Sequence, residues 1–199
     1  MIDMMKSHTI YNELMNGRII NAQVIGANGE FQANPLFSEV MDNFGDYRKQ
    51  YEMCGFQVEA TGEYIYVAKG VRHEAQKTDI AMKAYLLLII LGQYVTTNGF
   101  QMTGSRTDSK LSAINGGLSL ADIEKIQAMP HTKEWLDRAG MGDDLLKNIK
   151  TILVERHIMQ HNPVTEKFIL SQAGNHFFDE NTHRYKSEME HSHKPQNLP

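Results

Sequence analysis

The sequence is poor in cysteine and lacks the short signatures that mark most catalytic and metal sites. Its single cysteine, Cys54, excludes an internal disulfide and fits a reducing compartment. It stands beside Gly55 at an expected helix end, where we interpret it as a small buried side chain rather than a nucleophile. The first residues, Met1–Lys6, lead into polar residues and not into the apolar segment of a secretory signal. These features favour a cytoplasmic protein.

Histidine is frequent, with nine residues, but its spacing does not favour a metal site. His157 and His161 are four residues apart, yet on an expected strand and turn they would not share one helix face. The sequence contains no HExxH, CxxC or calcium-loop pattern and no G-x-S-x-G nucleophile pattern. The acidic pair Asp143-Asp144 stands where a helix is expected to begin, and the helix dipole accounts for it. We therefore expect no catalytic residues, no metal and no cofactor.

The charge balance is mildly acidic, with a formal net charge of -4. This balance is unlike that of a strongly basic nucleic-acid module, so any contact with phosphate needs a local cluster of cations. Hydrophobic residues at 41% and charged residues at 22% are ordinary for a globular protein. A chain of 199 residues can hold one large domain or two small ones.

The longest apolar stretch, residues 78–98, dominates the sequence. Its core, Ala84–Leu91, is uninterrupted and free of proline, which favours a helix that is buried on all sides. Thr78 is a candidate N-cap and Asn98 a candidate stop. A membrane span needs about 20 apolar residues, and Lys83 and several other polar residues interrupt this stretch. We predict a central helix of a soluble protein, with no membrane insertion.

The segment before this stretch begins with two predicted helices. A short helix is expected over 7–17, followed by a short strand over 19–25. Asn34 is expected to cap a second helix, which begins at Pro35, carries one apolar stripe and ends at Gly55. Glycine weakens a helix by about 1 kcal/mol relative to alanine, so the glycine within this helix, at position 45, predicts close packing there.

The clearest local pattern is a β-hairpin. Residues 56–60 and 63–68 flank Thr61-Gly62, which we predict to be a two-residue loop. In that register Val58 lies opposite Ile65, and both strands bury the same face. A helix followed by such a hairpin is typical of a winged helix.

The second half repeats this order of elements. A polar stretch over 99–117 is expected to be a loop or hinge. Short helices are predicted over 120–129, capped by Ser119, and over 132–139. A longer amphipathic helix follows Gly142-Asp143, and strands are then expected over 157–160 and 167–170.

The order of helix and hairpin therefore occurs twice, around 36–68 and 143–170. We predict a mostly α protein with small β-hairpins, of the α+β class, with a tandem winged-helix architecture. The predicted parts are an N-terminal winged-helix unit (1–77), a central buried helix (78–98), a C-terminal winged-helix unit (99–180) and a disordered tail (181–199).

Four basic residues of the second unit are candidates for DNA contact. Lys147 and Lys150 lie on the helix before the second hairpin, Arg156 at its end and Lys167 on the returning strand. In a helix-turn-helix relative this helix approaches DNA, and basic side chains there bind phosphates without reading bases. The alternative is that they form the solvated face of an amphipathic helix. A second basic cluster follows the first hairpin and comprises Lys69, Arg72, His73 and Lys77.

Several features together resemble a known family. They are Asn34-Pro35-Leu36-Phe37 at the start of a long helix, Gly55-Phe56, the aromatic strand Tyr64-Ile65-Tyr66-Val67, the long apolar helix, and a closing helix and hairpin that end near Phe177-Phe178. Over about residues 30–180, the chain resembles the MukE-type subunits of bacterial condensins. Its length and the lack of an acidic tail resemble the shorter MksE-like branch.

The resemblance implies a homodimer of tandem winged-helix subunits without enzymatic activity. Such subunits bind a kleisin, and through it an SMC-like ATPase, in a cytoplasmic, nucleoid-associated complex that organises the chromosome or defends the cell against plasmids. The resemblance also implies a DNA-facing surface on the second unit, where Lys147, Lys150, Arg156 and Lys167 match. The dense arginine cluster of the Muk branch is absent, so non-specific DNA binding by this chain alone is expected to be weak and salt-sensitive.

Two other classes of function are open at this stage. A dimeric winged-helix transcription regulator would bind one operator more tightly than bulk DNA, typically by about 10³ or more. A hydrolase with a site assembled in space would show a deep polar pocket. The condensin subunit is our leading interpretation, and the regulator is the alternative.

Overall fold

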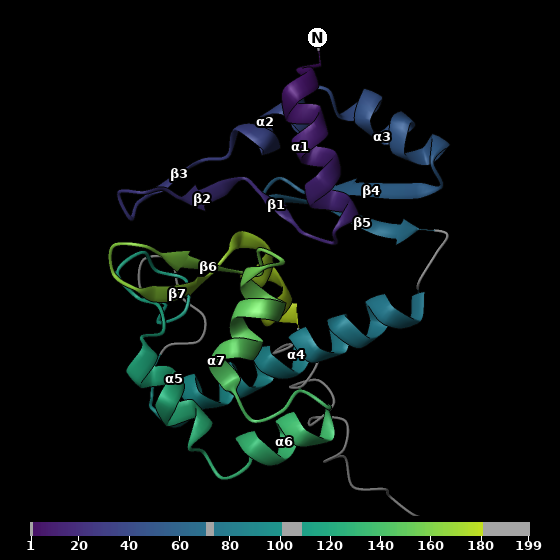
Figure 1. Cartoon of the computed structure of the whole chain (residues 1–199). Helices are drawn as coiled ribbons and strands as arrows, with labels where there is room; N and C mark the ends of the chain where they lie inside the picture. Colours follow the sequence, from purple (N-terminus) through teal and green to yellow (C-terminus); the bar gives the residue numbers. More distant parts are fainter. Residues whose placement is uncertain (1, 71–73, 101–108, 181–199) are drawn as a thin grey trace, which may run out of the picture.

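Helices make up about half of the chain, and the strands form three small antiparallel sheets. The computed structural model describes residues 2–70, 74–100 and 109–180 (Figure 1). The predicted α+β class is therefore confirmed. The predicted tail and residues 101–108 of the loop predicted over 99–117 lie outside the described residues, as do the side chains of the basic cluster around Arg72.

The N-terminal part consists of three helices around two small sheets. Asp3 caps the first helix by accepting hydrogen bonds from the main-chain N–H groups of Met5 and Lys6. Strand β5 lies between β1 and β4 in one sheet, and β2 pairs with β3 in the other. The elements are α1 (Met4–Met15), β1 (Ile20–Asn21), β2 (Gln23–Ile25), β3 (Phe31–Ala33), α2 (Pro35–Asp42), α3 (Phe44–Met53), β4 (Phe56–Ala60) and β5 (Tyr64–Gly70).

The helix that we predicted from Pro35 to Gly55 is in fact two helices, because the chain breaks at Asn43. Asn34 caps α2 as predicted, but the Asn43 side chain donates to the main-chain oxygen of Glu39, which favours a helix end there. The predicted close packing at Gly45 is wrong, since no atom lies within 4 Å of a Cβ added there. The predicted burial of Cys54 is also wrong, since this cysteine is exposed at the end of α3.

The first hairpin forms as predicted, but its register is shifted by two residues. Val58 lies opposite Val67 rather than Ile65. The cause is Thr61, whose main-chain N–H donates to the oxygen of Tyr64 and whose hydroxyl accepts from the N–H of Tyr64. The loop is therefore Gly62-Glu63, one residue later than predicted. A shift of two residues keeps the same side chains on the buried face, so Val58 and Ile65 are both in the core.

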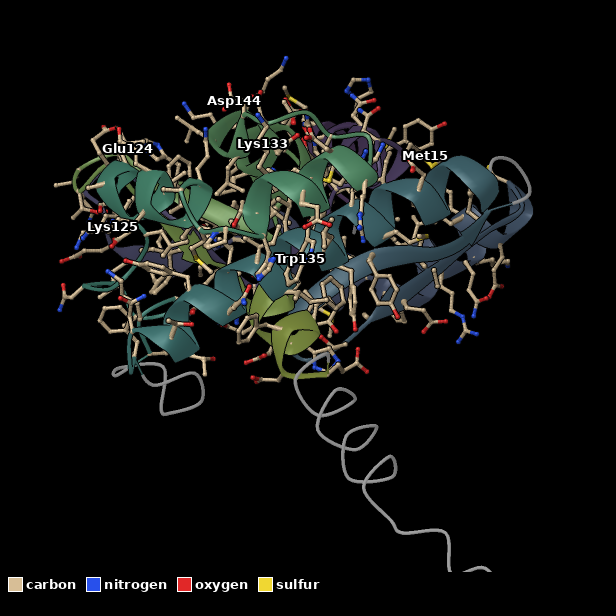
Figure 2. All side chains as sticks on the ribbon, turned by 90° about the horizontal axis from the view of Figure 1, so that it is seen from below. Met15, Glu124, Lys125, Lys133, Trp135 and Asp144 are labelled. Carbon is tan, nitrogen blue, oxygen red and sulfur yellow. The ribbon has the colours of Figure 1, made fainter. Side chains whose placement is uncertain are left out.

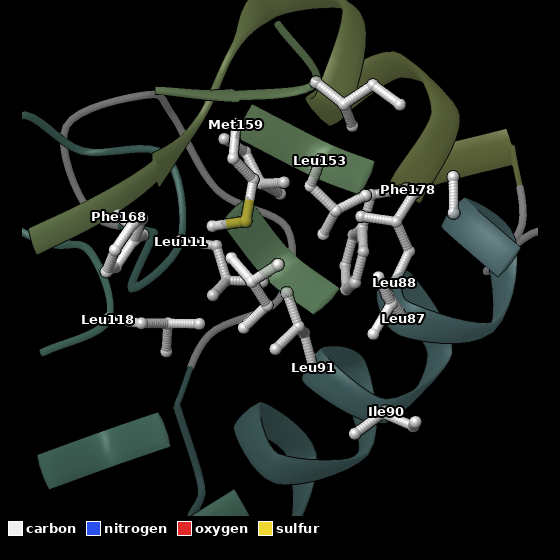
Figure 3. Packing of buried hydrophobic residues seen from close by; sticks show 14 of the residues in the cluster. Leu87, Leu88, Ile90, Leu91, Leu111, Leu118, Leu153, Met159, Phe168 and Phe178 are labelled. Carbon is white, nitrogen blue, oxygen red and sulfur yellow. The ribbon is translucent and has the colours of Figure 1, made fainter. Parts of the chain in front are cut away.

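The central helix, α4 (Glu74–Thr97), begins before Thr78, so the predicted cap at Thr78 is wrong. Leu87 and Leu91 on one side of α4 are fully buried in the core of the C-terminal unit (Figure 3). The predicted burial on all sides is wrong, because the opposite side leaves Met82 and Ile89 exposed. Residues Asp79–Thr97 are long and apolar enough to cross a membrane, but 44% of that window is buried in the protein, as expected of a core helix.

The C-terminal part wraps α4 with short helices and a hairpin. Ser119 caps α5 in a capping box with Asp122, as the sequence led us to expect for Ser119. The amphipathic helix before the second hairpin starts as an α-helix, capped by Asp144, and continues as a π-helix. A last helix covers residues 172–180. The other elements are α5 (Leu120–Gln127), α6 (Thr132–Arg138), α7 (Leu145–Asn148), η1 (Ile149–Val154), β6 (Met159–Asn162) and β7 (Lys167–Leu170).

Two hydrophobic cores hold these parts. The N-terminal core joins α1, α2, α3 and the β1-β5-β4 sheet, and the larger core joins α4 to the elements after it. Ile19 and Tyr64 belong to the larger core although they lie in the N-terminal part. The two units therefore pack directly against each other, with β2 and β6 at their junction (Figure 1).

Candidate functional site

The four basic residues predicted to contact DNA all belong to the C-terminal unit, but their surroundings differ. Lys147 on α7 and Lys150 on η1 are exposed and stand three residues apart along one helical segment. Lys167 on β7 is half-buried, and its Nζ donates to the main-chain oxygen of Asn115 at 3.4 Å. Lys147 and Lys150 therefore form a small basic surface that is exposed to solvent.

Arg156 contributes to the contact between the units. Its guanidinium donates to the main-chain oxygens of Asn16 and Gly17, at 3.4 and 3.3 Å, where α1 ends. A cation is favourable at this position because the carbonyl end of a helix carries partial negative charge. The main-chain oxygen of Arg156 also accepts from the N–H of Ile19 at 3.2 Å. The guanidinium of Arg156 therefore has a structural role, which competes with the DNA contact that we predicted for it.

Side-chain amides form much of the junction between the units. Gln160 on β6 accepts from the N–H of Ile25 at 2.7 Å and donates to the oxygen of Gln23 at 3.1 Å. It thus pairs with the open edge of β2 as a neighbouring strand would. The N–H of Gln23 donates to the side chain of Gln172 at 2.8 Å, so two glutamines of the C-terminal unit hold this strand edge of the N-terminal unit.

Buried asparagines complete the junction. Asn21 on β1 donates to the oxygen of His157 at 2.9 Å and accepts from the N–H of Ala173 at 3.0 Å. Asn162 on β6 donates to the oxygen of Gly29 at 2.9 Å. Both asparagines are almost fully buried, where unpaired amides would be costly. The junction is therefore specified by hydrogen bonds as well as by packing.

An open cleft of about 500 Å³ lies beside this junction. One wall comes from α1, β1, β2 and the start of α2, and the other from the end of η1 and from β6. Apolar residues form much of the lining, among them Ile20, Val24 and Leu36 from the N-terminal unit. The lining contains no lysine or arginine. A cleft of this kind suits an apolar or neutral partner better than a phosphate backbone.

Polar groups at one end of the cleft are largely paired with each other. Glu13 forms an ion pair with Arg18 at 2.9 Å and lies 3.7 Å from Nδ1 of His157. The same Nδ1 is 2.9 Å from the main-chain oxygen of Ile19. His157 has a positive φ of 60, a strained conformation that the surrounding junction holds in place. No group of three potential metal ligands occurs within the described ranges.

A second polar network lies between α4 and the start of α5. Asp122 accepts from the hydroxyl of Tyr94 at 2.7 Å and from Nζ of Lys110 at 3.1 Å. Burial alone raises the pKa of Asp122, but the hydrogen bonds from Ser119, Tyr94 and Lys110 outweigh it and hold this pKa well below its usual range. Burial and the bond to Asp122 raise the pKa of Tyr94 to about 12. This network ties α4 to α5, and we assign it a structural role.

Sequence patterns alone did not reveal the cleft or the amide junction. The groups that form the amide junction are 133 to 152 residues apart in the chain, as in the contacts of Asn162 with Gly29 and of Asn21 with Ala173. Local spacing carries no signal for such pairs. The one available signal was the presence of glutamine and asparagine at strand positions that face the interior, where an amide needs partners.

Together these features define the class to which the protein belongs. It is an α+β protein with two hydrophobic cores and an open cleft at the junction of its two parts, and the residues that the structure describes contain no cluster of metal ligands. The family of the condensin complex protein MksE matches residues 5–181, and the chain belongs to that family. None of the curated proteins matches the chain.

The family assignment confirms the resemblance seen in the sequence and narrows the function. The family points to an accessory subunit of a condensin complex, a kind of subunit that is not catalytic. A condensin subunit is a soluble cytoplasmic protein, in agreement with the burial of α4. No finding favours the transcription regulator that we kept as the alternative.

Proposed function

We propose that this chain is a non-enzymatic adaptor that dimerises, binds a kleisin and supports DNA binding by an SMC-like condensin. The family match over residues 5–181 carries the proposal. In this proposal each unit is a winged helix, since α3 is followed by the β4–β5 hairpin and η1 by the β6–β7 hairpin. The boundaries at residues 77, 98 and 180 belong to the same proposal.

The kleisin is the partner that links this chain to the ATPase. An adaptor needs a surface that accepts a peptide segment, and the described part of the chain has apolar side chains lining an open cleft at its junction. The direct test is co-purification of the full chain with the kleisin of the same condensin. If the two proteins stay separate at micromolar concentrations in size-exclusion chromatography, the adaptor proposal fails.

DNA contact is proposed to be non-specific, through Lys147, Lys150, Arg156 and Lys167. Because Arg156 also holds the junction, the test reverses charge only at Lys147, Lys150 and Lys167. The assembled complex should lose DNA affinity, and the salt dependence of binding should become less steep by about 0.9 for each phosphate that is no longer neutralised. Folding should be unchanged, since the two helical lysines are exposed.

The matched control reverses charge at two other exposed lysines. Lys125 lies on α5 and Lys133 on α6, both exposed, and Figure 2 shows them beside Glu124 and Asp144 on a face of mixed charge. Their reversal should leave DNA affinity nearly unchanged. Equal affinity of the wild type and the triple variant across a salt series would refute the assignment of the DNA surface. Nucleoid association in cells should follow the same pattern.

A further inference from the structure

The outer edge of strand β6 is unpaired. In the β6–β7 hairpin, the N–H and oxygen of Phe168 bond to Leu118 and the N–H of Leu170 bonds to the oxygen of Leu111, so these groups of β7 point away from β6. Their partners across the hairpin, His161 and Met159, must then direct their own main-chain groups to the opposite side. Within the part of the chain that the structure describes, no hydrogen bond uses those groups.

This unpaired edge borders the junction cleft. Met159 and His161 both belong to the lining of the cleft, but Met159 is fully buried and only His161 is exposed. Strand β6 is the strand of its hairpin that lies nearer the N-terminal unit (Figure 1). Unpaired N–H and C=O groups on a strand edge are a template for another strand. Val24 and Leu36 lie across the cleft and can receive apolar side chains.

The side chains that line the cleft indicate which kind of ligand can bind there. The amides of Asn21, Asn34 and Gln160 already bond to protein main chain, so they offer little to a small polar ligand. A phosphate backbone would find no lysine or arginine in the lining. What remains is main-chain bonding capacity beside an apolar wall, which is the combination that an extended peptide uses when it adds a strand.

We propose that a short extended segment of the partner binds in this cleft by pairing with the edge of β6 at His161. The segment has apolar side chains at alternate positions, because every second residue of a strand faces the wall formed by Val24 and Leu36. This inference rests on the proposed function, in which the partner is the kleisin. It places the kleisin contact on the junction of the two units, so binding also clamps them together.

The test uses a proline substitution at the strand edge. In the His161→Pro variant the edge loses one N–H donor that the hairpin itself does not use, and proline is tolerated on strand edges. The His161→Ala variant also loses the imidazole but keeps the N–H, and it serves as the matched control. With the full chain and the kleisin subunit, His161→Pro should bind about tenfold more weakly than His161→Ala, as expected for the loss of one main-chain hydrogen bond.

A second pair of variants tests the same cleft without a substitution at position 161, so its result does not depend on whether His161→Pro folds. In the Val24→Glu variant a charge enters the apolar wall of the cleft and should also weaken kleisin binding by at least tenfold. Val164→Glu places the same charge on the exposed β6–β7 turn and should bind as the wild type does. In the wild-type complex, hydrogen exchange at the amide of His161 should slow by about tenfold or more.

The outcomes separate the inference from the proposed function. If the kleisin binds all four variants equally, or if protection from exchange appears elsewhere and not at His161, the strand-addition site is refuted and the adaptor function stands. If the kleisin does not bind the wild-type chain, the adaptor function is refuted and the inference falls with it. Selective loss in His161→Pro and Val24→Glu supports both.

Discussion

Asn21 provides the sharpest test of how the two units are joined. Its side chain is 2% exposed and bonds two main-chain groups of the C-terminal unit, the oxygen of His157 and the N–H of Ala173. Ala173 stands in the first turn of the last helix, where N–H groups have no partner within the helix. Asn21 therefore satisfies this helix from the other unit, and no neighbouring side chain replaces it.

The expected cost of Asn21→Ala follows from these two bonds. A buried group left without its partner costs roughly 1–3 kcal/mol. Since the cleft side admits water, which replaces part of the loss, we expect a total of about 2–4 kcal/mol. A small domain has a free energy of unfolding of only about 5–15 kcal/mol, so this loss would be large.

The assay is equilibrium unfolding in urea, followed by far-ultraviolet circular dichroism and by the fluorescence of Trp135, which reports on the C-terminal unit. If Asn21 couples the units, Asn21→Ala should lower the free energy of unfolding and separate the two signals. The control is Asn12→Ala on the exposed side of α1, where the change should stay within about 0.5 kcal/mol. A loss at Asn21 no larger than at Asn12 would refute the reasoning.

Two further predictions concern packing and assembly. A Cβ added at Gly174 would collide with the main-chain oxygen of Ile158, so Gly174→Ala should destabilise the protein by about 1–3 kcal/mol in thermal or urea unfolding. At Gly45 no atom lies within 4 Å of an added Cβ, so Gly45→Ala should stabilise α3 by about 0.5–1 kcal/mol. Equal effects of the two substitutions on stability would contradict the described packing. The purified chain should be a dimer in multi-angle light scattering, and a monomer at micromolar concentration would contradict the proposed assembly.

The sequence was sufficient for elements whose signals are local. Asn34 and Ser119 act as helix caps where expected, and the returning strand of the second hairpin covers 167–170 as predicted. The first strand of that hairpin was predicted over 157–160 but covers Met159–Asn162, because His157 has a positive φ and His161 and Asn162 pair with Phe168 and Lys167. The same kind of reasoning missed the register of the first hairpin. Both Thr61-Gly62 and Gly62-Glu63 keep Val58 and Ile65 on one face, so hydrophobic alternation cannot distinguish registers that differ by two residues.

Errors about α4 and about the site have another cause. Apolar composition predicts that a helix prefers burial, but the neighbours available decide how much of it is covered, and Met82 and Ile89 remain uncovered in a single copy of the chain. The proposed peptide site depends on which side of β6 stays unpaired. That property follows from Leu111 and Leu118 covering β7, an arrangement that no spacing in the sequence reveals.

The network around Asp122 predicts how stability depends on pH. The pKa of Asp122 is depressed in the folded chain, so its contribution is complete above the unfolded pKa of about 3.9 and is lost as pH falls. The pKa of Tyr94 is raised to about 12, so its contribution is complete below the unfolded value of about 10 and is lost as pH rises toward 12. Full stabilisation is therefore expected between about pH 5 and pH 9.

The variants Asp122→Asn and Tyr94→Phe test the acidic and the alkaline loss of stability separately. Asp122→Asn loses charge-assisted bonds and should cost about 1.5–3 kcal/mol at pH 7, and its difference from the wild type should shrink as pH falls below about 4. For Tyr94→Phe, the difference should shrink above about pH 10 instead. Urea unfolding at a series of pH values measures both. A constant difference across the series would mean that Asp122 acts through packing or capping alone, because only a group whose proton affinity changes on folding produces a slope with pH.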